Sequence, residues 1–263
     1  DIKDKGWYKH VFGSSGTELR RFWYSIMYFL ISFYCVGMTN VIAQKRGVMY
    51  NVEGPIADLG FDAFYAFTHQ LYSYNPWICD QFTYILVGIC AVWIGIFMGR
   101  RNKGYQRRIV IYKRWLFLVS FCFNMRSITV ISTVLPRPWK DDEEWTFCKN
   151  EFDSHFSWNV AWETFEYMAG NKNICYDFFY SGHTVNVILV CLLVTKYSKC
   201  IYFKIIIWCL AIFTLITIIA VRAHYTIDIW GGLIITILLW IVWDMQVRYR
   251  EGLFAKLERP ERE

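Results

Sequence analysis

The sequence has too few charged side chains to cover the surface of a water-soluble protein of its size. Asp, Glu, Lys and Arg make up only 19% of the 263 residues, whereas 56% are hydrophobic and 20% are aromatic. Soluble domains carry about 25% charged residues. The apolar residues also cluster in runs of about 20, the length that a helix needs to cross the hydrocarbon core of a bilayer. The composition therefore excludes an ordinary soluble domain and predicts a membrane protein.

Several motifs that would indicate other functions are missing. The sequence contains no glycine-rich phosphate loop, no cysteine pair spaced for zinc and no internal repeat. Most of the nine cysteines lie in the apolar runs, where cysteine behaves as a small hydrophobic residue. A disulfide between Cys148 and Cys175 is left open by the sequence. Contacts with anionic lipid head groups explain the net charge of +6, so we expect no nucleic-acid partner.

Six apolar runs predict an all-α, polytopic membrane protein built as a six-helix transmembrane bundle. The bundle would cover residues 22–247, between tails at 1–21 and 248–263. Arg20 and Arg21 precede the first run and no small-residue cleavage site follows it, so we expect this helix to be retained. The fourth run is short, and we expect its helix to begin earlier, in the head-group zone. The runs are 22–43, 82–98, 115–135, 183–197, 201–221 and 225–247.

Charge asymmetry between the loops predicts the orientation in the membrane. The loop between the second and third runs contains seven basic residues and no acidic one. The loop between the third and fourth runs contains nine acidic residues against four basic ones. By the positive-inside rule the basic loop is cytosolic and the acidic loop faces the lumen or the outside. An even number of spans then places both termini in the cytosol.

Two histidines begin apolar runs at the same predicted depth on the exoplasmic side. His183 lies in the string CYDFFYSGHT and His224 in RAHYTID. Ionisable groups at membrane depth are costly and usually functional. His224 and Asp228 are four residues apart, which predicts one helical face and lets the carboxylate orient one imidazole nitrogen. Ser181 and Gly182 precede a helix N-terminus whose free amides suit an anion such as phosphate.

The string CYDFFYSGHTV, followed by HYTID, resembles the two signature motifs of the sphingomyelin synthase family, membrane relatives of the type 2 phosphatidic acid phosphatases. The strings PIADLGFD at 55–62 and RSITVISTVLPRP at 126–138 resemble further family stretches in the same order. The resemblance covers about residues 55–235. One departure is Tyr176, where animal members usually have glycine.

The resemblance implies a two-step transfer of a phosphorylated head group. His224, polarised by Asp228, would attack the phosphorus of a glycerophospholipid, form a phosphohistidine and expel diacylglycerol. His183 would protonate the departing alkoxide and then accept a proton from ceramide. Arg126 and Arg222 are the candidates for binding the phosphate. Phosphocholine is the expected head group, with phosphoethanolamine and phosphoinositol as alternatives.

Four further residues are candidates for orienting groups or contacting the head group: Asp177, Glu163, Ser181 and Tyr225. We expect no metal and no cofactor, because arginine and helix amides can stabilise the developing charge. The expected location is the Golgi or plasma membrane, with the site facing the lumen or the outside. A homo-oligomer is left open.

Three alternative functions are compatible with parts of the sequence. Lipid phosphate hydrolysis fits less well, because the phosphatase pattern would need lysine at Val130, proline at Tyr180, and serine and arginine at Thr217 and Ile218. Diacylglycerol could replace ceramide as acceptor, giving a phosphatidylcholine:diacylglycerol cholinephosphotransferase. A membrane transporter is the non-enzyme alternative, but the ionisable residues gather on one side instead of running through the spans.

Overall fold

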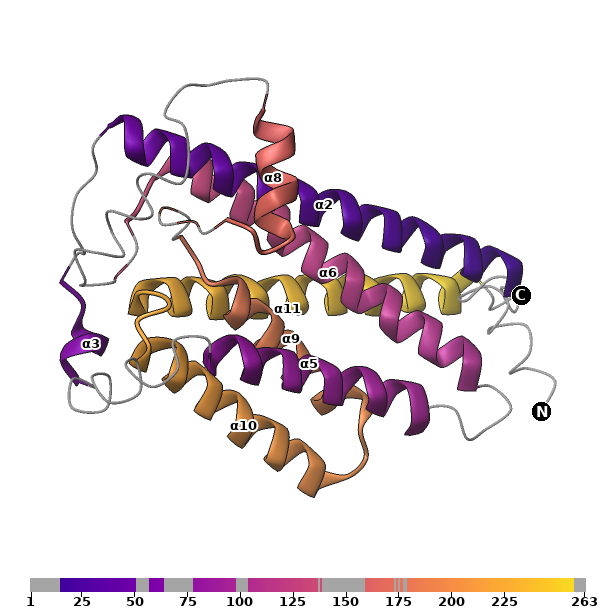
Figure 1. Ribbon diagram of the computed structural model, residues 1–263. Coiled ribbons are helices and arrows are strands. Elements are labelled where there is room, and N and C mark those ends of the chain that lie inside the picture. Colours follow the sequence, from indigo (N-terminus) through magenta and orange to yellow (C-terminus); the bar gives the residue numbers. More distant parts are fainter. Residues whose placement is uncertain are drawn as a thin grey trace, which may run out of the picture.

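The computed structural model describes residues 15–50, 57–63, 78–97, 104–136, 138, 159–172, 174, 176 and 179–257. These residues form eight helices and no strand (Figure 1). The helices are α2 (Ser15–Met49), α3 (Leu59–Ala63), α5 (Ile78–Phe97), α6 (Gly104–Ser132), α8 (Val160–Met168), α9 (Gly182–Tyr197), α10 (Ile201–Ala220) and α11 (Thr226–Leu257). Asp177, Cys148 and Cys175 lie outside the described residues, so the structure does not place them.

Five of the helices are long and apolar enough to cross a membrane. Their apolar segments are Leu19–Met49, Ile78–Ile96, Arg108–Ser132, Ile201–Ala220 and Thr226–Tyr249. The prediction of an all-helical protein with several membrane spans is therefore confirmed. A helix also occupies the fourth predicted run, but α9 has only 16 residues.

Helix α9 is short because it lies inside the bundle. It packs against α5, α6, α10 and α11, and most of its apolar side chains are buried. At about 1.5 Å per residue it is about 24 Å long, which is less than the hydrocarbon thickness of about 30 Å. The prediction that this helix begins earlier is wrong, because Ser181 has extended backbone angles and caps the helix: its Oγ accepts a hydrogen bond from the Thr184 amide at 3.3 Å.

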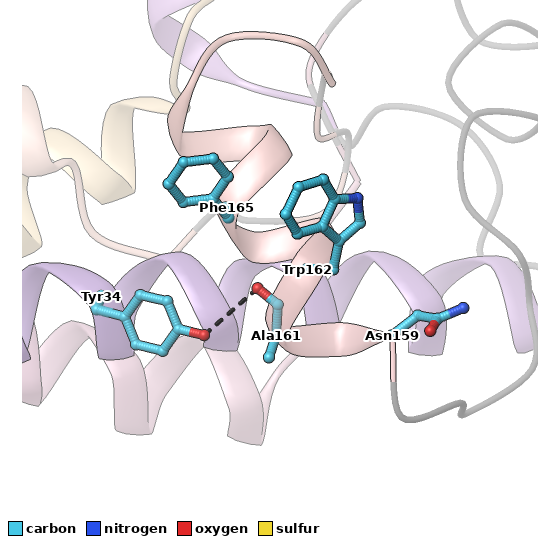
Figure 2. Close-up of a pocket in the computed structure, with 5 residues that line it drawn as sticks. All are labelled: Tyr34, Asn159, Ala161, Trp162 and Phe165. Carbon is cyan, nitrogen blue, oxygen red and sulfur yellow. Dashed lines mark hydrogen bonds between the residues drawn. The ribbon is translucent and has the colours of Figure 1, made fainter.

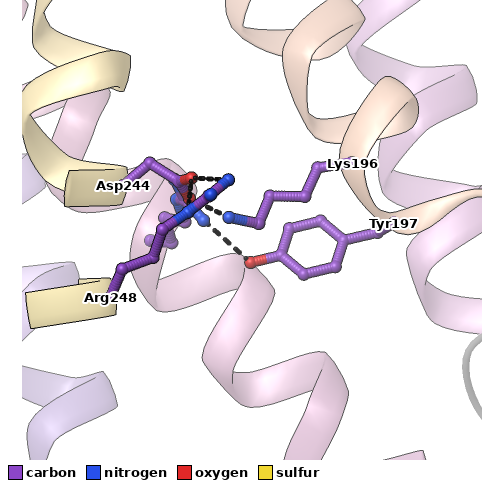
Figure 3. Close-up of polar contacts among 5 residues, drawn as sticks. Lys196, Tyr197, Asp244 and Arg248 are labelled. Atoms are coloured by element: carbon purple, nitrogen blue, oxygen red, sulfur yellow. Dashed lines mark hydrogen bonds and ion pairs between the residues drawn. The ribbon is translucent and has the colours of Figure 1, made fainter. Parts of the chain in front are cut away.

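The two ends of the bundle carry different chemistry. The N-termini of α5, α9 and α11 meet the C-termini of α2, α6 and α10 at one end, on the left in Figure 1. At the other end Asp244 of α11 ties three helices together (Figure 3). Nη2 of Arg114 lies 3.3 Å from Asp244 Oδ1, Lys196 of α9 also contacts this carboxylate, and Nε of Arg248 lies 3.0 Å from Oδ2. This network joins α6, α9 and α11.

Two glycines allow α11 to approach the start of α9 closely. A Cβ on Gly232 would lie 3.0 Å from the backbone oxygen of Ser181 and 3.0 Å from Cβ of Thr184. A Cβ on Gly231 would lie 3.1 Å from Cβ of Tyr180. Larger residues would hold the two helix starts apart, so this glycine pair determines how closely the residues at these ends can meet.

Candidate active site

His183 and His224 face each other at the end of the bundle where α9 and α11 begin. Nδ1 of His183 lies 3.4 Å from Nε2 of His224, and the ring centroids are 5.6 Å apart at an interplanar angle of 61°. His183 is the second residue of α9, and His224 lies in the turn before α11. Residues 41 positions apart in the sequence are therefore brought within hydrogen-bond range.

Each histidine has a carboxylate on its other ring nitrogen. Oδ1 of Asp80, in the first turn of α5, lies 2.5 Å from Nε2 of His183. Oδ2 of Asp228 lies 3.5 Å from Nδ1 of His224, and contacts of this kind often shorten when a substrate binds. The four side chains form a row in which the two carboxylates orient the rings. Nε2 of His224 and Nδ1 of His183 are the two nitrogens that remain facing each other.

Asp228 reaches His224 by bending back over the start of α11. The Ile229 amide donates to the Tyr225 carbonyl at 3.4 Å, which makes Tyr225 the N-cap residue. Oδ2 of Asp228 accepts a hydrogen bond from the Tyr225 amide at 3.1 Å, as in a capping box. The spacing predicted a shared helical face, but the helix begins at Thr226 and His224 precedes it. His224 and Asp228 are therefore close because Asp228 folds back onto the turn before α11, and not because the two residues share a helical face.

Arg126 of α6 lies beside the N-terminus of α9. A Cβ on Gly182 would be 3.3 Å from Nη1 of Arg126, and Arg126 is only 9% exposed. Its charge acts on the Asp228 carboxylate and on Tyr180. Burial raises the pKa of Tyr180, whose hydroxyl donates to the Cys122 carbonyl and so remains neutral. The guanidinium and the α9 amides thus lie together next to the histidines, where they suit an anionic group.

Arg222 and Tyr225 pack against other segments. The guanidinium carbon of Arg222 lies 5.2 Å from the ring centroid of Phe61 in α3, which is a cation–π contact. The Tyr225 hydroxyl donates to the Pro136 carbonyl at 3.0 Å, and its ring lies 5.7 Å from that of Phe61. Both residues therefore brace the turn that carries His224.

Glu163 forms a buried ion pair between α8 and α2. Its Oε2 lies 2.9 Å from Nζ of Lys45 and its Oε1 lies 3.2 Å from the same nitrogen. The side chains are 9% and 1% exposed. The structure thus pairs Glu163 with a lysine, whereas the carboxylate on His183 comes from Asp80.

Asp80 has no role in the sequence-based prediction. The second apolar run was expected to begin at residue 82, which left Asp80 in a loop, whereas α5 begins at Ile78. An available signal was an acidic residue just outside an apolar run at the same predicted membrane face as His183. Within the described residues, no group of three or more His, Cys, Asp or Glu side chains is arranged to hold a metal ion.

A cavity of about 500 Å³ lies elsewhere, between α2 and α8 (Figure 2). The Tyr34 hydroxyl donates to the Ala161 carbonyl across it at 3.4 Å. Trp162 and Phe165 are stacked with ring centroids 5.7 Å apart, and both are more than half exposed. Neither histidine lines this cavity, so it is separate from the candidate active site.

Comparisons with known proteins show which proteins this chain resembles in sequence. The PAP2 superfamily C-terminal family matches residues 174–245, which include both histidines and Asp228. Phosphatidylcholine:ceramide cholinephosphotransferase 1 of Gallus gallus is 25% identical over 209 residues, covering 78% of this chain and 47% of the relative. The protein of the same name from Homo sapiens is 26% identical over 222 residues, covering 76% and 47%.

A third relative is Sphingomyelin synthase-related protein 1 of Mus musculus, which is 22% identical over 251 residues, covering 89% of this chain and 48% of the relative. The chain spans about half the length of these curated relatives. The resemblance to the sphingomyelin synthase family is confirmed by these matches.

Proposed function

We propose that this protein is a membrane phosphotransferase that moves phosphocholine from phosphatidylcholine to ceramide and releases diacylglycerol. The observation that carries this proposal is the pair of facing imidazoles, each oriented by its own carboxylate. One imidazole is thereby available as a nucleophile and the other as a general acid and base. The names of the relatives support the choice of phosphocholine and ceramide.

In the first step, Nε2 of His224 attacks the donor phosphorus. The P–O bond to diacylglycerol breaks as the N–P bond forms, and protonated His183 gives the proton on Nδ1 to the departing oxygen. Asp228 stabilises the positive charge that develops on His224, and Arg126 stabilises the phosphoryl oxygens. The products are diacylglycerol and a phosphocholine group on His224.

In the second step, His183 acts as the general base and His224 is the leaving group. Nδ1 of His183 takes the proton of the primary hydroxyl of ceramide, and the hydroxyl oxygen attacks the phosphorus. The N–P bond breaks, which releases sphingomyelin and restores neutral His224. Asp80 stabilises the imidazolium form of His183 after each proton gain.

Binding of the donor requires the two histidine rings to move apart, and the exposed fractions of the side chains indicate which ring can move. A nitrogen that attacks in line lies about 3–3.5 Å from phosphorus, and a general acid lies within about 3 Å of the leaving oxygen. The rings, now 3.4 Å apart at their facing nitrogens, must therefore separate. His183 and Asp80 have side chains 28% and 25% exposed, against 5% and 0% for His224 and Asp228. His183 and Asp80 are therefore the residues that have room to move.

The proposed function includes a membrane arrangement. In it, α9 crosses the bilayer among the five longer spans, packed against four of them, both termini are cytosolic, and the histidines face the lumen of the Golgi or the cell exterior. The predicted charge asymmetry of the loops supports this arrangement. A tag inserted between residues 141 and 144 should be protected from reagents added to the cytosolic side of sealed vesicles. Labelling of the tag from that side would contradict the orientation.

The direct test uses purified protein with labelled ceramide and one phospholipid at a time. Phosphatidylcholine should give labelled sphingomyelin, identified by mass, and should outperform phosphatidylethanolamine and phosphatidylinositol. His224→Ala should abolish product, whereas His155→Ala, a control histidine from the acidic loop, should not. Full activity of a folded His224→Ala variant would end the proposal. Phosphatidic acid is included as a donor because of the PAP2 match, and release of free phosphate alone would favour a phosphatase.

A further inference from the structure

Residues 58–61, which are distant in sequence from the histidine motifs, hold the start of α11. Oδ2 of Asp58 accepts a hydrogen bond from the Thr226 amide at 2.8 Å, and the Thr226 hydroxyl donates to Oδ1 at 2.5 Å. Oδ1 also accepts a hydrogen bond from the Gly60 amide at 2.9 Å. One carboxylate therefore satisfies amides at the starts of two helices, α3 and α11, and its negative charge lies at the positive end of the α11 dipole.

Gly60 makes this contact sterically possible. A Cβ at this position would lie 2.1 Å from Oγ1 of Thr226 and 3.0 Å from Cγ2 of Ile219. No side chain fits there without moving α3 away from α11. Phe61, the next residue, is 6% exposed and lies between the Tyr225 ring and the Arg222 guanidinium. Residues 58–61 thus contact the chain on both sides of His224.

The turn that carries His224 depends on such support. Arg222 has a φ of +52°, a left-handed conformation that is unfavourable for a residue with a Cβ. A conformation of this kind persists where surrounding contacts hold it. The contacts that hold this turn are the cation–π contact of Arg222 with Phe61 and the hydrogen bonds between Thr226 and Asp58. His224 lies between these two attachments.

We propose that Asp58 is a positioning residue for the nucleophile. Through Thr226 it holds the turn at 222–226 so that Nε2 of His224 points toward the donor phosphorus, while Asp58 itself touches no reacting atom. The inference rests on the proposed role of His224. A displacement of about 1 Å in a reacting group lowers the rate about 100-fold, so loss of this attachment should appear mainly in kcat.

The test compares variants of both partners with a matched control. Asp58→Ala removes both hydrogen bonds to Thr226 and should lower kcat for transfer at least 10-fold, with the donor KM within about twofold of wild type. Thr226→Val removes only the hydroxyl bond and keeps the amide bond, so it should lower kcat in the same direction by a smaller factor. Thr226→Ser keeps the hydroxyl and should retain most of the activity. Asp62→Asn changes an exposed acid on the same short helix and should behave as wild type. The double variant Asp58→Ala, Thr226→Val should be no slower than Asp58→Ala alone.

Hydrogen exchange gives a measurement that does not depend on activity. Amides 225–229 should exchange faster in Asp58→Ala than in wild type or Asp62→Asn. Where Asp58→Ala fails to fold, Asp58→Asn and Thr226→Val serve in its place. Wild-type kcat in folded Asp58 and Thr226 variants would overturn the inference, as would unchanged exchange at 225–229. If His224→Ala is inactive, either of these results contradicts only the positioning role of Asp58. If a folded His224→Ala variant is active, the proposed function itself is wrong.

Discussion

Gly232→Ala should slow the enzyme while leaving it folded. The added Cβ would lie 3.0 Å from the Ser181 carbonyl oxygen and from Thr184 Cβ, both at the start of α9. The carbonyl belongs to the backbone and cannot rotate away. Ordinary contact is reached only if the start of α9 moves back from α11 by a few tenths of an ångström.

The size of the two effects decides what the experiment will show. Overpacking of this kind costs about 1–3 kcal/mol, whereas alanine is favoured over glycine in a helix by about 1 kcal/mol. The net loss of folding free energy is therefore about 0–2 kcal/mol, which a folded membrane protein can tolerate. A shift of a few tenths of an ångström between His183 and His224, compared with the roughly 100-fold cost of a 1 Å displacement, should lower kcat by about 3- to 10-fold.

The assay is the rate of sphingomyelin formation at saturating donor and acceptor, normalised to folded protein in detergent or nanodiscs. Gly88→Ala is the matched control, because a Cβ there meets no atom within 4 Å. It should leave kcat unchanged and slightly stabilise α5. A wild-type kcat for Gly232→Ala would refute the reasoning that the approach of α11 to α9 determines the distance between the histidines.

Asp228→Asn should slow transfer to ceramide and release of the head group to water by the same factor, because in the proposed mechanism both reactions share the His224 intermediate; a loss of transfer with unchanged hydrolysis would contradict that mechanism. EDTA should leave activity intact, because Arg126 and the α9 amides stabilise the phosphoryl charge, and a strict need for a divalent ion would count against this. Lys45→Met should lower the free energy of unfolding by about 3–5 kcal/mol, because it leaves Glu163 buried without its lysine. The double variant Lys45→Met, Glu163→Leu should recover much of that loss in the same denaturation experiment.

The helices could be predicted from the sequence because hydropathy is a local property. Each of the six apolar runs contains a helix, and α9 and α10 agree with their runs to within one residue, whereas α2, α6 and α11 extend well beyond theirs. The start of α9 was predicted wrongly because a helix enclosed by four others does not have to match the thickness of the bilayer. Ser181, which ends the extended segment by capping α9, was a local signal for the correct boundary.

The candidate site could be predicted only where its contacts are local. Asp228 lies four residues from His224, so the spacing alone indicated the pair, although not the turn that brings them together. Asp80 is 103 residues from His183, and Asp58 is 168 residues from Thr226. No periodicity in a single sequence reports such contacts. They depend on which helix starts meet at one end of the bundle.

The network around Asp244 has a consequence for how a lipid can reach the site. It fastens α6, α9 and α11 at the end of the bundle away from the histidines, and these are the helices that carry Arg126, His183 and Asp228. A helix that is held at one end can rotate about that end. Over the length of α9, about 24 Å, a rotation of about 10° about the fixed end moves the other end by about 4 Å. In the proposed mechanism, such a rotation would let the donor enter between the imidazoles while the ion pairs of Asp244 at the opposite end of the bundle stay intact.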